Sequence, residues 1–97
     1  MPHFKVIING RGIELPFEGE PAVGFFTTRK VHAADLPSAE SLAKSLVLSE
    51  WRPGGTYAQA NLGSVPVLSV DQSFQVGWFT GTFGRNPSGY AFYRHEG

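Results

Sequence analysis

The sequence predicts a single α+β domain over residues 1–97, with one amphipathic helix packed on one face of an antiparallel or mixed sheet of five to six strands. Three observations favour this fold. With 97 residues the chain is long enough for one core. Its composition suits a folded core, since 41% of the residues are apolar and 16% are charged. Segments rich in aromatic and β-branched residues alternate with turn residues. A single stretch near the middle has apolar residues at helical spacing, which predicts the order βββαβββ.

The N-terminal segment predicts two strands that form a hairpin. Residues 3–9 alternate in the manner of a strand, and Asn9 and Gly10 tolerate the positive φ of a tight turn. The second arm is expected over residues 13–17. Because Pro16 has no N–H to donate, that arm is expected at a sheet edge.

The third strand is expected over residues 23–34, a run dense in aromatic and β-branched side chains. One of its two faces ends in apolar residues, and this face is predicted to line the core. It consists of Phe25, Thr27, Arg29, Val31 and Ala33.

The helix is predicted to begin after Asp35, which can cap it, and to include Pro37 in its first turn. Apolar residues recur at spacings of three and four along one stripe, which is expected to be buried: Ala39, Leu42, Ala43, Leu46, Val47 and Trp51. Leu48 lies away from this stripe and is expected to be exposed.

The C-terminal half predicts a loop and then further strands. Residues 56–64 are small and polar, and this loop is expected to be mobile. Strands are expected over 65–70 and 74–78, either joined by a tight turn or continuous with a bulge between them. A short closing strand over 89–94 follows a glycine-rich loop.

Charge and composition argue for a protein that associates with itself. Eight basic and eight acidic residues give a net charge of zero, so the chain has no long-range field for nucleic acid or an anionic membrane. Copies do not repel one another, which favours a homodimer. The absence of cysteine fits the cytoplasm, and no apolar run suits a membrane span. The candidate interface residues are Leu48, Trp78 and Phe79.

The residues that usually carry catalysis are scattered. His3, His32 and His95 do not lie at the local spacing of a metal site, although a site assembled by folding stays open. No serine lies in a nucleophile elbow, and the carboxylates are dispersed. We therefore expect no catalytic residue, no cofactor and no metal. A small enzyme with a site assembled by folding is the alternative.

One strand combines hydroxyl, cationic and aromatic side chains, and it is the best candidate for ligand binding. Its polar residues, extended by two arginines from the C-terminal segment, are Thr27, Thr28, Arg29, Lys30, Arg85 and Arg94. Such a surface would bind single-stranded RNA or an anionic small molecule. Alternatively, Arg29 is structural, with its stem at the core rim. Residues 89–92 match an RNA-recognition signature only in part, since Ser88 replaces its basic residue.

The sequences GFFTTR at 24–29 and GYAFY at 89–93 resemble a family of small uncharacterised bacterial proteins over most of the chain. That family brings no known function, so the resemblance implies a stand-alone protein and nothing about chemistry. The order of three strands and then a helix is similar to that of the antitoxin partners of HicA-type ribonuclease toxins. From the residues themselves, we expect a non-enzymatic binding or protein-interaction domain that acts as a homodimer, with another protein as a further possible partner.

Overall fold

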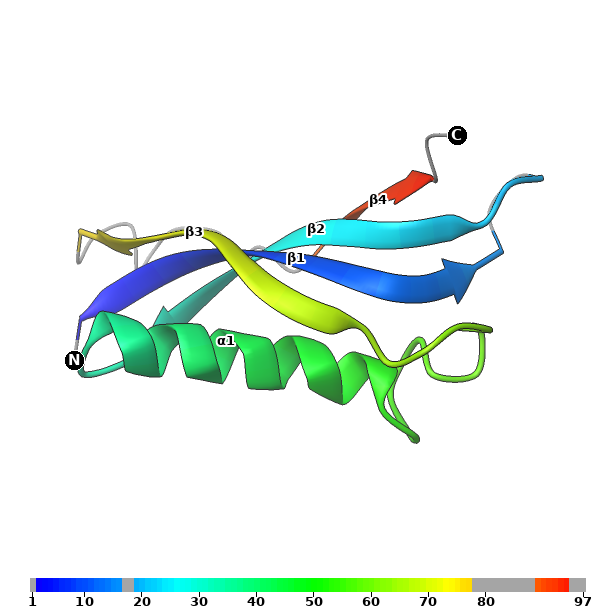
Figure 1. Cartoon of the computed structure of the whole chain (residues 1–97). Helices are drawn as coiled ribbons and strands as arrows, with labels where there is room; N and C mark the ends of the chain where they lie inside the picture. Colours follow the sequence, from blue (N-terminus) through cyan, green and yellow to red (C-terminus); the bar gives the residue numbers. More distant parts are fainter. Residues whose placement is uncertain (1, 17–18, 78–88, 95–97) are drawn as a thin grey trace.

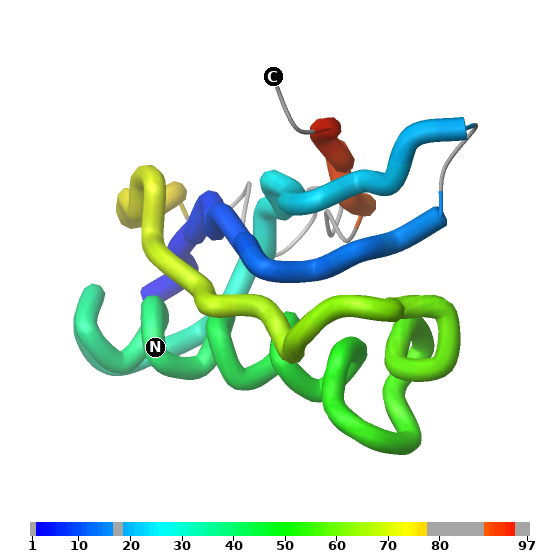
Figure 2. The backbone as a smooth tube through the Cα atoms, turned by 45° about the vertical axis from the view of Figure 1, so that its right-hand side comes forward, coloured from blue at the N-terminus to red at the C-terminus, as the bar shows by residue number. Residues whose placement is uncertain are grey.

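The computed structural model describes residues 2–16, 19–77 and 89–94, and in them it confirms an α+β fold. Four antiparallel strands form one sheet in the order β3-β1-β2-β4, and the helix lies along one face of it (Figure 1, Figure 2). The elements are β1 (His3–Leu15), β2 (Ala22–His32), α1 (Leu36–Trp51), β3 (Val67–Val76) and β4 (Tyr90–Arg94). Within the described ranges, no helix is long and apolar enough to cross a membrane.

The predicted hairpin turn at Asn9 and Gly10 is wrong, because both residues lie inside the continuous strand β1. Gly10 pairs with Phe25 of β2 on one side and with Leu68 of β3 on the other. Pairing on both sides satisfies the backbone groups of this segment without a turn. The described residues therefore form four strands rather than the expected five to six.

The two alternatives for the segment that follows the predicted loop resolve into one bulged strand, β3, over Val67–Val76. Between Ile7 and Ile8 of β1, the partner on β3 changes from Gln72 to Val70. Asp71 is therefore the extra residue of a β-bulge, and it is exposed. Of the residues expected in these strands, only the last, at position 78, lies outside the described ranges.

The helix begins where predicted but buries a narrower stripe. Asp35 caps it by accepting a hydrogen bond from the Ser38 N–H. Hydrogen bonding to the Ser38 side chain, and then to its backbone, lowers the pKa of the Asp35 carboxyl. Every fourth residue is buried: Ala39, Ala43, Val47 and Trp51. Leu42 and Leu46 are 42% and 44% exposed, contrary to the predicted stripe, because the helix packs along a single i, i+4 row. Leu48 is half-buried, not exposed as expected.

The core lies between this row and the inner face of the sheet, which is the face turned toward α1. On β2 the predicted core face is confirmed, since Phe25, Thr27 and Val31 are buried. The remaining buried apolar residues of the sheet side come mainly from β1: Phe4, Val6, Ile8, Ile13, Leu15, Ala22 and Ala33. Because only one face of the sheet is buried, apolar residues recur at every second position along the strands.

The segment that follows α1 is anchored along β1, although its composition predicted a mobile loop. The Leu62 N–H donates to the Glu14 carbonyl at 2.8 Å, and the Ser64 N–H donates to the Gly12 carbonyl at 2.9 Å. Gly63 lies so close to the β1 backbone that a Cβ there would be 2.7 Å from the Glu14 nitrogen. The sequence showed no sign of this anchoring because the partners lie far apart along the chain.

Asn61→Ala is expected to release this loop. The Asn61 Oδ1 accepts from the N–H groups of Glu14 and Gly63, and its Nδ2 donates to the Ser64 carbonyl. At about 0.5–1.5 kcal/mol for each net hydrogen bond, the free energy of unfolding should fall by about 2 kcal/mol. Urea denaturation measures that change, and limited proteolysis should cut residues 56–64 sooner. Gln59→Ala, at an exposed neighbour, is the control and should change neither result.

Candidate functional site

The predicted ligand-binding strand does not present one surface. Thr27 and Arg29 lie on the inner face of β2, whereas Thr28 and Lys30 lie on its outer face, turned away from α1. The Thr27 hydroxyl is already engaged, since it donates to the Gly89 carbonyl at 2.8 Å. These residues are therefore divided between two environments.

The other predicted site residues do not complete that surface. Arg94 pairs with Ala22, so eight residues of β2, or roughly 26 Å, separate it from Lys30. Arg85 lies outside the described residues, as do the predicted interface residues Trp78 and Phe79.

An aromatic cluster joins β2, β4 and the end of α1. The Trp51 indole is sandwiched between the rings of Phe25 and Tyr57, with centroid distances of 5.2 and 4.8 Å. Tyr90 and Phe92 of β4 meet the indole edge-on at 5.9 and 6.4 Å. Sequence periodicity identified Trp51 as a core residue, but no local signal linked it to Tyr57 or to β4.

A polar network crosses the aromatic cluster. Arg29 Nη2 lies 2.8 Å from Glu50 Oε1, and the Tyr90 hydroxyl donates to the same carboxylate oxygen. Trp51 Nε1 donates to the Tyr90 oxygen at 3.3 Å, and the Arg29 guanidinium lies 5.3 Å from the Tyr90 ring centroid. Burial, and then the hydrogen bond to Glu50, raise the pKa of Tyr90 well above its usual value.

This network gives Arg29 a structural role, which was the alternative left open by the sequence. Its charge is neutralised by Glu50 of α1, and only 11% of its side chain is exposed. Tyr90 stays protonated at neutral pH and cannot act as a nucleophile there. The network therefore ties β2 and β4 to the helix and offers little to a ligand.

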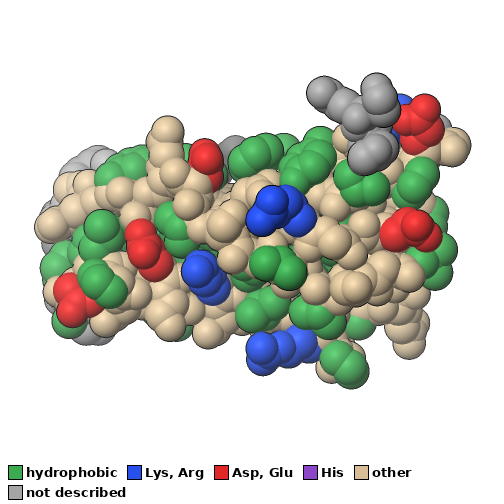
Figure 3. All heavy atoms as spheres, viewed as in Figure 1, with side chains coloured by type: hydrophobic (Ala, Val, Ile, Leu, Met, Phe, Trp, Pro, Cys, Tyr) green, Lys and Arg blue, Asp and Glu red, His purple; other side chains and the backbone are tan. Residues whose placement is uncertain are grey.

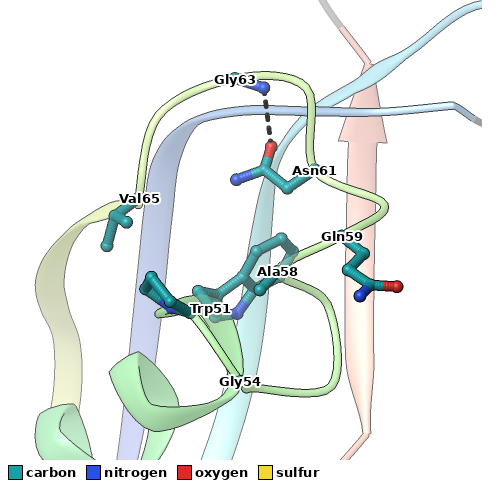
Figure 4. Close-up of a pocket in the computed structure, with 8 residues that line it drawn as sticks. Trp51, Gly54, Ala58, Gln59, Asn61, Gly63 and Val65 are labelled. Carbon is teal, nitrogen blue, oxygen red and sulfur yellow. Dashed lines mark hydrogen bonds between the residues drawn. The ribbon is translucent and has the colours of Figure 1, made fainter.

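A pocket of about 410 Å³ lies between the end of α1 and the loop that follows it (Figure 4). Trp51, Ala58 and Val65 provide apolar wall, and Asn61 turns its amide oxygen to the Gly63 N–H. The lining residues that the structure describes include no charged side chain and no histidine, serine or cysteine. None of these described lining residues supplies a side chain for acid–base or nucleophilic chemistry.

Two histidines meet on the outer face of the sheet. His3 and His32 are partners in the register of β1 and β2, and their ring centroids lie 3.8 Å apart. His3 is only 7% exposed, and its Nε2 has no hydrogen-bond partner in the structure. Burial and the nearby charges of His32, the N-terminal amine and Lys30 lower the pKa of His3. The sequence did not predict this contact, because His3 and His32 lie far apart along the chain.

The domain is expected to lose stability on acidification through His3. Since its folded pKa lies below the ordinary value of about 6.5, the unfolded chain binds more protons as pH falls through that value. The contribution of neutral His3 is therefore complete above about pH 7 and declines below about 6.5. Melting temperatures measured across this range should fall more steeply for the parent than for His3→Gln. Equal pH profiles would contradict this role.

The described residues contain no cluster of three or more potential metal ligands. No family model, curated protein or solved structure matches the chain.

Proposed function

We propose that the protein is a non-enzymatic interaction domain that acts as a homodimer, and that β3 is its interface. The observation that carries the proposal is the outer edge of β3. This ten-residue strand ends the sheet and pairs with β1 on one side, and no described residue pairs with its other side. An exposed strand edge is a template for another strand.

The composition of β3 supports this use of its edge. Natural edge strands are commonly protected by lysine, proline, short length or a bulge. Residues 67–76 include no Lys, Arg or Pro, and their bulge interrupts the ladder at one point only. Val67 and Phe74 are 65% and 44% exposed. Pairing of β3 with its copy would cover apolar surface and satisfy backbone groups at once. Asp71, at the bulge, is the one charged residue of the strand.

The surface charge is compatible with self-association. On the face seen in Figure 3, acidic and basic side chains are scattered singly among apolar ones. With a net charge of zero, copies meet without long-range repulsion. A cytoplasmic location, predicted from the lack of cysteine, would suit such a domain.

Sedimentation of the full chain tests the proposal. The parent is expected to sediment as a dimer, and Val67→Lys combined with Phe74→Lys should weaken association by about tenfold or more. Leu62→Lys is the matched control, because Leu62 is 69% exposed and lies in the loop. Leu48→Lys tests the helix-face interface that the sequence suggested. A monomer at high micromolar concentration would refute the dimer, and loss of the dimer in Leu48→Lys alone would move the interface to α1.

Single-stranded RNA or an anionic ligand is the second candidate, and the outer face of β1 and β2 favours it. Lys5, Arg11 and Lys30 lie on this face with Phe26, which is 42% exposed. Residues 3–11 and 24–32 include no carboxylate. Aromatic stacking and cations are what such ligands require. Fluorescence anisotropy with labelled oligouridine should then show binding that weakens with salt and with Phe26→Ala, whereas no binding at low salt would exclude this candidate.

A further inference from the structure

We propose that His3 and His32 form a binding site for a divalent transition-metal ion such as Zn²⁺ or Cu²⁺. The site is independent of the proposed dimer. Its two side chains are held by the register of β1 and β2, which makes them direct cross-strand partners. Imidazole nitrogen is a preferred ligand of these ions.

The buried nitrogen of His3 points to a missing partner. His3 is 7% exposed, and its Nε2 accepts and donates no hydrogen bond in the structure. Buried polar atoms are nearly always paired, because an unpaired one loses its water without compensation. A metal ion would give this nitrogen a partner, and neutral imidazole has the free electron pair that coordination needs.

The spacing of the rings suits two bonds to one ion. Zinc–nitrogen bonds of about 2.0–2.1 Å at a tetrahedral angle place the two ligating nitrogens about 3.3 Å apart. The centroids of the His3 and His32 rings are 3.8 Å apart, so small side-chain rotations can bring one nitrogen of each ring to this spacing. His32 is exposed, which leaves the remaining coordination positions to water.

The charges around the pair define which ions it would take. The N-terminal amine and Lys30 act on His3 and favour its neutral form. The next outer-face residue of β1 is Lys5, and the β3 residues paired with His3 and Lys5 are the apolar Val76 and Phe74. With these cations and no carboxylate in the set, hard ions such as Mg²⁺ lack oxygen ligands, and only ions with a strong preference for imidazole overcome the repulsion.

Zinc titration of the tag-free full chain tests the proposal. By calorimetry we expect one Zn²⁺ per chain, no binding of Mg²⁺, and loss of zinc binding as pH falls and the imidazoles take up protons. His32→Gln should weaken zinc binding by at least about tenfold. Because His32 is exposed, this variant should keep the parent melting temperature. His3→Gln is the second variant, and His95→Gln, which removes the remaining histidine, is the matched control.

Two results would overturn the site. One is equal zinc affinity in the parent and in His32→Gln, and the other is zinc that perturbs neither the His3 nor the His32 side-chain resonances in NMR spectra. Val67→Lys alone, at a residue that pairs with Arg11 far along β1 from His3, should bind zinc as the parent does. Failure of the dimer therefore leaves the metal site intact, and failure of the metal site leaves the dimer intact.

Discussion

Trp51→Ala is expected to unfold the domain or to lower its free energy of unfolding by about 3–5 kcal/mol. The indole is 2% exposed, and the rings of Phe25 and Tyr57 cover its two faces. Alanine would leave a cavity between β2, β4 and α1 and remove the donor to the Tyr90 hydroxyl. For a domain of this size, the melting temperature should fall by at least about 12 °C.

Circular dichroism melts of Trp51→Ala and Leu42→Ala provide the comparison. Leu42 lies on the same helix but is 42% exposed, so its truncation should shift the melting temperature far less. A Trp51→Ala protein that melts within about two degrees of the parent would show that the aromatic cluster does not hold the fold.

Gly10→Ala is expected to cost about 1–3 kcal/mol of stability through overpacking. A Cβ at residue 10 would overlap the ring of Phe25, its cross-strand partner. Phe25 is fully buried and stacks on Trp51, so its ring cannot move without disturbing the aromatic cluster. Gly77→Ala is the control, since a Cβ there meets nothing within 4 Å. Equal urea midpoints for the two variants would contradict this reason for glycine at position 10.

Gly10 also shows why the sequence predicted a hairpin that the described residues do not form. Asn-Gly is a strong hairpin signal because both residues tolerate the positive φ of a tight turn. In the structure this glycine makes room for an aromatic ring from the neighbouring strand, and that demand arises only after β1 and β2 have paired. The sequence near residue 10 cannot distinguish a tight turn from close contact with a neighbouring ring, because both require a residue without a side chain.

The parts of the fold that were predicted correctly follow from one-sided burial. The core face of β2 and the burial of Trp51 were predictable from the spacing of apolar residues over a few consecutive turns or positions. The helix start was predictable from the capping residue Asp35. The site residues could not be inferred in this way. Arg29 and Glu50 are 21 residues apart, and Tyr90 lies 40 residues beyond Glu50. The contact of His3 with His32 likewise depends on strand register, which composition does not specify.

The central position of β1 has a consequence for biosynthesis. His3 pairs with His32 on one side and with Val76 on the other, so the first strand to leave the ribosome gains full pairing on its second side only when residue 76 has emerged. At about 5–20 residues per second, one edge of β1 waits roughly 2–9 s after β2 has been translated. During that interval the nascent chain carries an uncovered hairpin that chaperones or neighbouring nascent chains can reach. Slowing translation between β2 and β3 should therefore lower the yield of folded protein more than slowing it after Val76.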